Sequence, residues 1–161
     1  MDIPFTIRRA ELRDVEALVR LRFELMHMAA ALGVPTNLSE EDWEAVREAT
    51  REYFEKALAS GEHCGVVAEA EGIVVGCGGI VFMERPPYQG NLQGREAYLM
   101  NMYTEPEWRG KGIGSAIVAE LLRCARNAGA KRVSLDAEQN ARRLYAQAGF
   151  HGNVEAMEIL L

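Results

Sequence analysis

A glycine-rich run with the sequence WRGKGIGS, residues 108–115, carries the clearest chemical signal in the chain. Glycine has no Cβ, so its backbone can take positive φ and approach a bound group closely. An apolar helical pattern starts directly after the run, and the first N–H groups of a helix lack intrahelical partners and suit an anion. Arg109 and Lys111 add positive charge here, although the formal net charge of the chain is -6. The run therefore predicts a binding site for a phosphate or diphosphate.

Two well-known phosphate-binding arrangements do not fit the spacing of these glycines. A Walker A loop requires Gly-x4-Gly-Lys-Ser/Thr, and here Lys111 is followed by Gly112. A dinucleotide-binding turn requires Gly-x-Gly-x-x-Gly or Ala, whose last position falls on Ser115 or Ile117. A dinucleotide-dependent oxidoreductase is therefore disfavoured, although Asp136 lies about where that motif places its ribose-binding acid.

A third arrangement, Arg/Gln-x-x-Gly-x-Gly/Ala, matches Arg109, Gly112 and Gly114 between a predicted strand and a predicted helix. This turn resembles the acyl-CoA-binding turn of the GCN5-related N-acetyltransferases, the GNAT superfamily. The resemblance extends to YTEP at residues 103–106 and to RRLYAQAGF at residues 142–150, which looks like the family's later helix with its Tyr…Gly-Phe ending. A glycine turn that only tightens a corner between strand and helix explains neither the cations nor the second motif.

The resemblance implies that acetyl-CoA is the acyl donor and that its diphosphate sits on main-chain N–H groups of the glycine-rich run. The implied cofactor-binding residues of the run are Arg109, Gly110, Lys111, Gly112, Ile113, Gly114 and Ser115. In the family the pantetheine arm pairs like an extra strand with the strand before the turn, which assigns main-chain contacts to Met102, Tyr103 and Thr104. A main-chain N–H near Met102 is also a candidate donor to the thioester carbonyl, where it would stabilise the tetrahedral oxyanion.

Tyr145 is the side chain that the resemblance marks as catalytic. The leaving group is a thiolate, whose thiol titrates at about pH 8.5 if it behaves like cysteine. A tyrosine with the ordinary pKa of about 10 stays protonated at neutral pH and can donate that proton. Many family members carry an asparagine seven positions before this tyrosine, where this chain has Glu138. The nearest asparagine, Asn140, is therefore expected either to contact the cofactor or simply to cap a helix.

A base is needed if the acceptor is an amine, because a primary alkylamine has a pKa of about 10.4 and is mostly protonated at neutral pH. The candidates, acting directly or through water, are His27, Glu84, Glu96 and Asp136. No spacing argument selects one of them, and a chain of waters to bulk solvent would serve as well. Strict alternation along the strand would put Leu99, Asn101 and Tyr103 on one face, unless a bulge intervenes.

In the family, the first two helices and the loop before the central strand usually shape the acceptor pocket, which here means residues 11–61 and 85–95. The loop is expected to act either as a lid that excludes water from the thioester or as a solvated hairpin connection. No motif identifies the acceptor, so amino acids, polyamines, aminoglycosides, peptide N-termini and protein lysines remain open. Dimerisation is common in the family, and a homodimer also remains open.

Hydrophobic periodicity predicts the elements that must position these residues. Helices are expected over residues 11–32, from the N-cap Ser39 to near Gly61, over 113–128 and over 140–148. Strands are expected over residues 5–9, 63–69, 73–82, 96–104, 132–136 and 154–161. Glycines at 76, 78 and 79 suggest a bulge or a close backbone neighbour. With the resemblance, this order predicts a mixed α/β (α+β) fold. Its twisted, mostly antiparallel sheet has about six or seven strands, is flanked by about four helices and splays at the strand before the glycine turn.

The chain has 161 residues, of which 48% are hydrophobic, and this fits a single domain over residues 1–161. Its acidic balance argues against non-specific nucleic-acid binding, although a local basic patch remains open, so no nucleic-acid partner is expected. No apolar run reaches the roughly 20 residues that cross a membrane. Cys64, Cys77 and Cys124 are odd in number and widely spaced, which predicts free thiols and no metal site. Because the first residues show no secretory signal, a cytoplasmic location is expected.

We therefore expect an acetyl-CoA-dependent N-acetyltransferase that moves the acetyl group to a primary amine, small or peptidic, by direct transfer in a ternary complex. The rival hypothesis is a non-catalytic acyl-CoA-binding or regulatory module of the same fold. The two differ in what they release, because only the enzyme produces free CoA when an amine is present. Tyr145, together with Arg109, Gly112 and Gly114, favours the enzyme.

Overall fold

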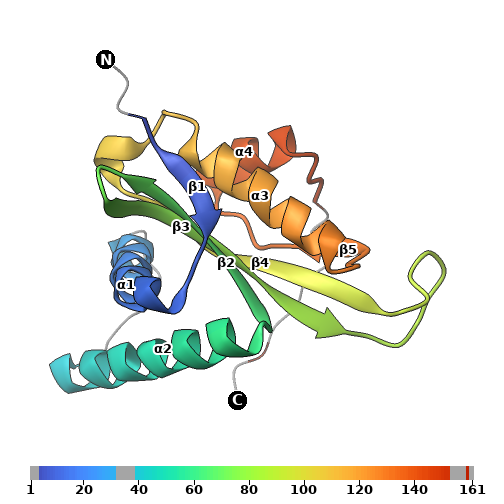
Figure 1. Cartoon of the computed structure of the whole chain (residues 1–161), viewed down its shortest axis with the longest axis horizontal. Helices are drawn as coiled ribbons and strands as arrows, with labels where there is room; N and C mark the ends of the chain where they lie inside the picture. The colour runs from blue at the N-terminus through green and yellow to red at the C-terminus, as the bar shows by residue number, and fades with distance from the viewer. Residues whose placement is uncertain (1–3, 32–38, 153–158, 160–161) are drawn as a thin grey trace.

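One twisted sheet organises the fold, and its five described strands follow the order of the chain (Figure 1). The computed structural model describes residues 4–31, 39–152 and 159. The strands are β1 Thr6–Arg9, β2 His63–Ala70, β3 Ile73–Glu84, β4 Arg95–Thr104 and β5 Arg132–Ser134. The first four pair antiparallel, and β5 joins β4 in parallel. The predicted mixed, mostly antiparallel α/β sheet is confirmed.

Four α-helices cover the two faces of this sheet (Figure 1). They are α1 Val15–Ala31, α2 Glu40–Ser60, α3 Ile113–Asn127 and α4 Arg142–Gln147. Two hydrophobic clusters result, because one joins α1 and α2 to the sheet and the other joins α3 and α4 to its opposite face. Side chains of β2 alternate between the two clusters, since Val66 belongs to the α3 cluster and Val67 to the α1–α2 cluster.

The ends of α2 follow from its sequence as predicted. Ser39 is the N-cap, and its Oγ accepts a hydrogen bond from the Asp42 N–H at 3.1 Å while the Asp42 carboxylate accepts from the Ser39 N–H at 3.0 Å. This reciprocal pair satisfies two of the free donors at the helix start. Gly61 ends the helix with a φ of 74°, a left-handed conformation that favours glycine.

Other boundaries differ from the expectation by a few residues. Residues 12–14 form a 3₁₀ turn, so α1 begins at Val15 rather than at residue 11. A second 3₁₀ turn, Gln139–Ala141, replaces the first turn of the expected fourth helix. The strand expected over 154–161 lies outside the described residues apart from Ile159, and the described sheet accordingly has five strands rather than six or seven.

The glycines of β3 lie opposite a bulge in β4, and Gly78 is closely approached by side chains of β4 and α3, as the glycine pattern suggested. The β3–β4 register pairs Cys77 with Tyr103 but Gly79 with Met100, so β4 carries an extra residue at this point. A Cβ at Gly78 would collide with the Met102 sulfur and lie 2.7 Å from Ile117 of α3. The missing side chain therefore lets α3 pack directly against the sheet where β4 bulges.

Candidate active site

The glycine-rich run joins β4 to α3, and its glycines serve two purposes. Gly110 and Gly112 have φ values of 76° and 85°, in the region that favours glycine. Apart from the glycine itself and its neighbours along the chain, no described atom lies within 4 Å of a Cβ built at either residue, so the space beside both is open. Gly114 instead lies against α4, because a Cβ there would make ordinary van der Waals contact with Leu144, at 3.4 Å. The run thus forms a cradle that side chains do not fill, and α4 lies against it.

The start of α3 leaves its main-chain donors available to a ligand. Gly112 is the N-cap and has no side chain that could accept a hydrogen bond from the first turn. Its carbonyl accepts from the Ala116 N–H at 3.0 Å, which begins the regular helical bonding. The preceding N–H groups, from Ile113 to Ser115, have no intrahelical acceptor and carry the positive end of the helix dipole. This arrangement suits an anion such as a diphosphate.

Both cations of the run pack on aromatic rings that precede them. The Arg109 guanidinium lies 5.5 Å from the centroid of the Tyr103 ring, and its Nε donates to the Thr104 carbonyl at 2.9 Å. The Lys111 Nζ lies 4.6 Å from the centroid of the Trp108 ring. The Arg109 contacts fasten the cradle to the end of β4, and both cationic side chains stay exposed.

The strand before the cradle separates from β5 as expected. The parallel ladder covers only Glu96–Tyr98 of β4 against Arg132–Ser134 of β5. From Leu99 to Thr104, no described strand pairs with β4 on that side. Within the described residues, the last six residues of β4 therefore form an open edge, which a short 3₁₀ turn at residues 106–108 connects to the cradle.

Alternation along β4 decides which main-chain groups face this edge. The N–H of Glu105, just after β4, donates to a carbonyl of β3 at 2.9 Å. Because main-chain groups point to alternate sides along a strand, Tyr103 also faces β3, whereas Met102 and Thr104 face the open edge. The Thr104 carbonyl already accepts from the Arg109 Nε at 2.9 Å, so its N–H is the main-chain group of Thr104 that remains for a ligand. Of the three predicted main-chain contacts, two thus lie on the exposed side.

The bulge also reverses the faces that strict alternation gives to β4. Leu99 belongs to the α3 cluster, whereas Tyr103 belongs to the α1–α2 cluster. The exception to strict alternation that the sequence left open, a bulge, therefore applies, and Leu99 and Tyr103 do not share a face. The physical reason is Asn101, whose φ of 58° inserts the extra residue of the bulge.

Tyr145 lies on α4 with its ring buried and 5.9 Å from the ring of Phe150. Burial, and then the nearby Glu138 carboxylate, raises the pKa of Tyr145 above its ordinary value. The hydroxyl is consequently protonated at neutral pH and remains a proton donor. The preceding residue, Leu144, contacts Gly114, so α4, the helix that carries Tyr145, lies against the cradle.

A second tyrosine, which the sequence did not single out, lies at the point where the strands separate. The Tyr98 hydroxyl donates to the Asp136 carboxylate at 2.7 Å. Burial, and then this hydrogen bond, raises the pKa of Tyr98 to about 12, and the neighbouring Tyr145 adds to the shift. Only its position two residues after Glu96 in the predicted strand could have drawn attention to Tyr98.

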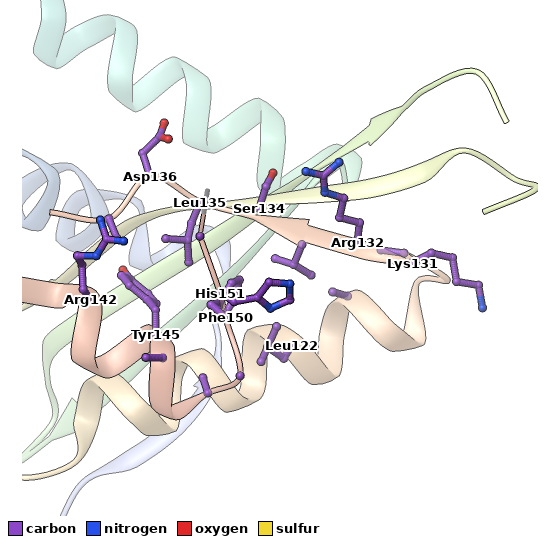
Figure 2. Close-up of a pocket in the computed structure, with 18 of the residues that line it drawn as sticks. Leu122, Lys131, Arg132, Ser134, Leu135, Asp136, Arg142, Tyr145, Phe150 and His151 are labelled. Atoms are coloured by element: carbon purple, nitrogen blue, oxygen red, sulfur yellow. The ribbon is translucent and has the colours of Figure 1, made fainter. Parts of the chain in front are cut away.

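A cavity of about 1040 Å³ adjoins this group and is lined by β5, α4 and the second half of α3. Figure 2 shows Asp136 projecting from the segment after β5 on one side, with Tyr145 reaching up from α4 on the other. The residues of the cradle do not line this cavity. The cavity therefore meets the candidate site at Tyr145 and Asp136 only.

Of the four candidate bases, Asp136 alone lies where β4 and β5 separate. Glu96 is buried, and its two carboxylate oxygens already accept from the Tyr88 hydroxyl at 2.7 Å and from the Arg85 Nε at 3.0 Å. His27 packs against Trp43, with ring centroids 5.2 Å apart, and Glu84 is exposed at the end of β3.

The loop of residues 85–95 closes the β3–β4 hairpin at the end of β4 that is far from the cradle (Figure 1). Glu96 anchors this loop through its bonds to Tyr88 and Arg85. The placement favours a solvated hairpin connection over a lid.

Asn140 is exposed within the 3₁₀ turn before α4, and its position excludes one of its two expected roles. Glu138 and Ala141 hold the N-cap positions of the turn and of α4, so the expectation that Asn140 caps a helix is wrong.

The three cysteines are free and buried, as predicted. His63 packs among α2 residues while Cys64 belongs to the α3 cluster, so these neighbours point to opposite faces of β2. In the described residues, no group of three or more His, Cys, Asp or Glu side chains is placed to hold a metal ion. Within the same residues, no helix is long and apolar enough to cross a membrane.

Comparison with known proteins gives a consistent result. Residues 32–150 match the family model described as the acetyltransferase (GNAT) family. The structure is similar to a predicted acetyltransferase from Clostridium acetobutylicum solved with acetyl-CoA, at 27% identity over 98% of this chain and 96% of that chain, with a TM-score of 0.83. No protein with a curated description matches.

Two more distant structures share the fold. A GCN5-related N-acetyltransferase from Ralstonia eutropha is 24% identical over 98% of this chain and 99% of that chain, with a TM-score of 0.81. A glucosamine-6-phosphate N-acetyltransferase from Arabidopsis thaliana is 20% identical over 98% of both chains, with a TM-score of 0.73.

Proposed function

Because this chain belongs to the GNAT acetyltransferase family, we propose that it is an acetyl-CoA-dependent N-acetyltransferase that acts on a primary amine by direct transfer. The observation that supports the proposal is the open edge of β4, which one short 3₁₀ turn, Pro106–Trp108, connects to the cradle at the start of α3. A long ligand with amide groups at one end and a diphosphate at the other matches this sequence of donors and acceptors.

In the proposed complex, the cradle residues Arg109–Ser115 hold the diphosphate through main-chain N–H groups and the positive charges of Arg109 and Lys111. The outward-facing main chain of Met102 and Thr104 pairs with the amides of the pantetheine arm. Tyr103 does not face the open edge, since its main chain faces β3. Its ring instead packs against the Arg109 guanidinium and so positions that cation. Asn140 is a further candidate contact from the turn before α4.

Acetyl-CoA supplies an activated acetyl group, and the residues at the strand separation stabilise charge and transfer protons while this group moves to the amine. The amine nitrogen attacks the thioester carbon, which forms the C–N bond, and the main-chain N–H near Met102 stabilises the developing oxyanion. Breaking the C–S bond releases a thiolate, to which the protonated Tyr145 hydroxyl donates a proton. We propose Asp136, which accepts a hydrogen bond from Tyr98 at the strand separation, as the carboxylate that receives the proton the amine loses.

The test is a thiol-release assay with acetyl-CoA and a panel of amines, combined with mass spectrometry of the acceptor. Free CoA that appears together with an acceptor heavier by one acetyl group supports the proposal. Acetyl-CoA that raises the melting temperature without CoA release on any amine would instead identify a non-catalytic acyl-CoA-binding module. A folded protein whose melting temperature does not respond to millimolar acetyl-CoA would refute both.

A further inference from the structure

Arg22 directs its guanidinium from α1 to the bulge of β4. Its Nη1 donates to the Asn101 side-chain oxygen at 3.3 Å, and Asn101 is the buried residue whose positive φ creates the bulge. The same cation acts on two neighbours, because it lowers the pKa of Cys77 and of Tyr53 against the larger raising effect of burial. Arg22 therefore faces the interruption of β4 from the α1–α2 side of the sheet.

The charge of Arg22 is not matched by the described part of the chain. Arg20, two positions earlier, pairs with Glu105, and Arg51 of α2 pairs with Glu16 at 2.6 Å. Among the described residues, no carboxylate lies within 4 Å of the Arg22 guanidinium, and Asn101 is its one hydrogen-bond partner. An arginine has five N–H donors, so the edge formed by Nε and Nη2 keeps its donors free.

A half-buried cation without an anion is costly to maintain, since its partial desolvation is not offset by a partner. The free Nε–Nη2 edge has the fork geometry that binds a carboxylate or a phosphate through two parallel hydrogen bonds. Its other edge is held by Asn101, which fixes the orientation of the fork. The site thus has the geometry of an anion receptor at which the anion comes from outside the described residues.

We infer that Arg22 binds an anionic group that the acceptor carries close to its amine, so that the acceptor class is zwitterionic amines such as amino acids. The inference rests on the proposed function, which places the thioester carbonyl near Met102, directly after the bulge residue Asn101. In an α-amino acid the amine and the carboxylate are separated by a single carbon atom. An anion held by Arg22 would therefore bring the amine beside the thioester. A carboxylate and a phosphate both accept two parallel hydrogen bonds from a guanidinium, so either group would fit Arg22. The negative charge of the Asp136 carboxylate would attract the protonated amine.

The test compares matched amines that differ only in this anionic group. Acetylation of α-amino acids is measured against the corresponding α-amino amides, with aminoethyl phosphate and a simple alkylamine as additional arms. The variants are Arg22→Gln, which keeps a donor for Asn101, and Arg22→Lys, which keeps the charge. Arg13→Gln is the matched control, because Arg13 is exposed and pairs only with Glu11.

We expect the native protein to favour the acid over the amide in kcat/KM. Arg22→Gln should lower kcat/KM for the acid by about 10- to 100-fold, the usual effect of one charged hydrogen-bonding partner, while leaving the amide within about threefold. Arg22→Lys, which keeps the charge, should retain part of the preference for the acid. The control variant Arg13→Gln should show the same kcat/KM values as the native protein. A purely structural role would lower both substrates together, which the ratio of acid to amide detects.

Failure of this inference is distinguishable from failure of the proposed function. Equal use of acids and amides, unaffected by Arg22→Gln, would overturn the role of Arg22 and leave the acetyltransferase standing. Acetylation of the alkylamine alone would do the same. If no amine of the whole panel is acetylated, both proposals fail.

Discussion

Tyr145 combines a buried ring with a hydroxyl that stays protonated at neutral pH. Its ring is part of the α3 core cluster, and it lies close enough to Tyr98, at the strand separation, to help raise the pKa of that residue. The surrounding burial and the Glu138 carboxylate raise the pKa of Tyr145, so the proton is retained rather than released. A residue used to donate a proton benefits from such an environment, because its protonated form dominates at working pH.

Replacing this hydroxyl tests its role with little structural disturbance. Tyr145→Phe should lower kcat by about 100-fold, since a general acid contributes at least that much, while the ring still packs against Phe150. The melting temperature and its shift with acetyl-CoA should stay unchanged. Because the raised pKa keeps the hydroxyl protonated, the loss should be constant from pH 6 to pH 9 in steady-state assays.

Tyr88→Phe is the matched control, because Tyr88 bonds Glu96 at the far hairpin end and should leave kcat unaltered. A Tyr145→Phe enzyme with native kcat would remove Tyr145 from the chemistry.

At the scale of elements, the cradle depends on backbone conformation and on empty space. Gly112 and Gly72 have similar φ values, 85° and 78°, and no described atom lies within 4 Å of a Cβ at either. They differ in location, since Gly112 caps α3 and Gly72 lies in the turn between β2 and β3. Substituting the same residue at both glycines therefore separates the loss of stability caused by backbone strain from any loss of acetyl-CoA binding.

Gly112→Glu and Gly72→Glu should each destabilise the fold by about 1–2 kcal/mol, the cost of a left-handed conformation for a residue with a Cβ. Only Gly112→Glu should abolish the rise in melting temperature caused by acetyl-CoA, because its carboxylate enters the space proposed for the diphosphate. Differential scanning fluorimetry with and without acetyl-CoA measures both effects. Equal ligand responses of the two variants would contradict the assignment of the cradle.

The sequence predicted the elements whose signals are local. Ser39 and Gly61 mark the ends of α2, and the glycine pattern of residues 108–115 marks the cradle. The bulge of β4 was harder to place, because its positive φ belongs to Asn101, while the glycine that makes room for it is Gly78 on the partner strand. The direction of the main chain at Met102 followed only once that register was known.

Contacts between distant side chains were beyond the sequence for a similar reason. Glu96 and Asp136 are both carboxylates beside predicted strands, but one is occupied by Arg85 and Tyr88 and the other lies at the strand separation. Arg22 followed the helical pattern of its segment and gave no sign of Asn101, 79 positions later in the chain. Pairings over such separations depend on how the layers pack.

At the scale of the whole molecule, His63 couples the packing of α2 on the sheet to pH. Its ring lies 5.8 Å from that of Phe54, and it fills the space where a side chain at Gly79 would be. Burial lowers the pKa of His63 from 6.5 to about 4. The unfolded chain therefore binds a proton more readily than the folded protein between these values.

The sign of the effect follows from the lowered pKa. The stability that neutral His63 contributes is present above pH 6.5 and is lost as the pH falls toward 4, by at most about 3 kcal/mol. Urea unfolding at pH 7 and pH 4.5 measures this loss, and His63→Leu should reduce it, because carboxylates titrate equally in both proteins. An identical pH dependence of the two would show that His63 is protonated without cost.

The open edge of β4 has one more consequence. Extended main chain with outward-facing N–H and C=O groups is the surface on which β-strands of separate molecules join and aggregate. Here that surface runs from Leu99 to Thr104, and the bulge at Asn101 interrupts it, which is one of the ways in which natural sheets protect an edge. A ligand seated along this edge would also act as its cover, so occupancy of the site and colloidal stability of the protein are tied to the same six residues.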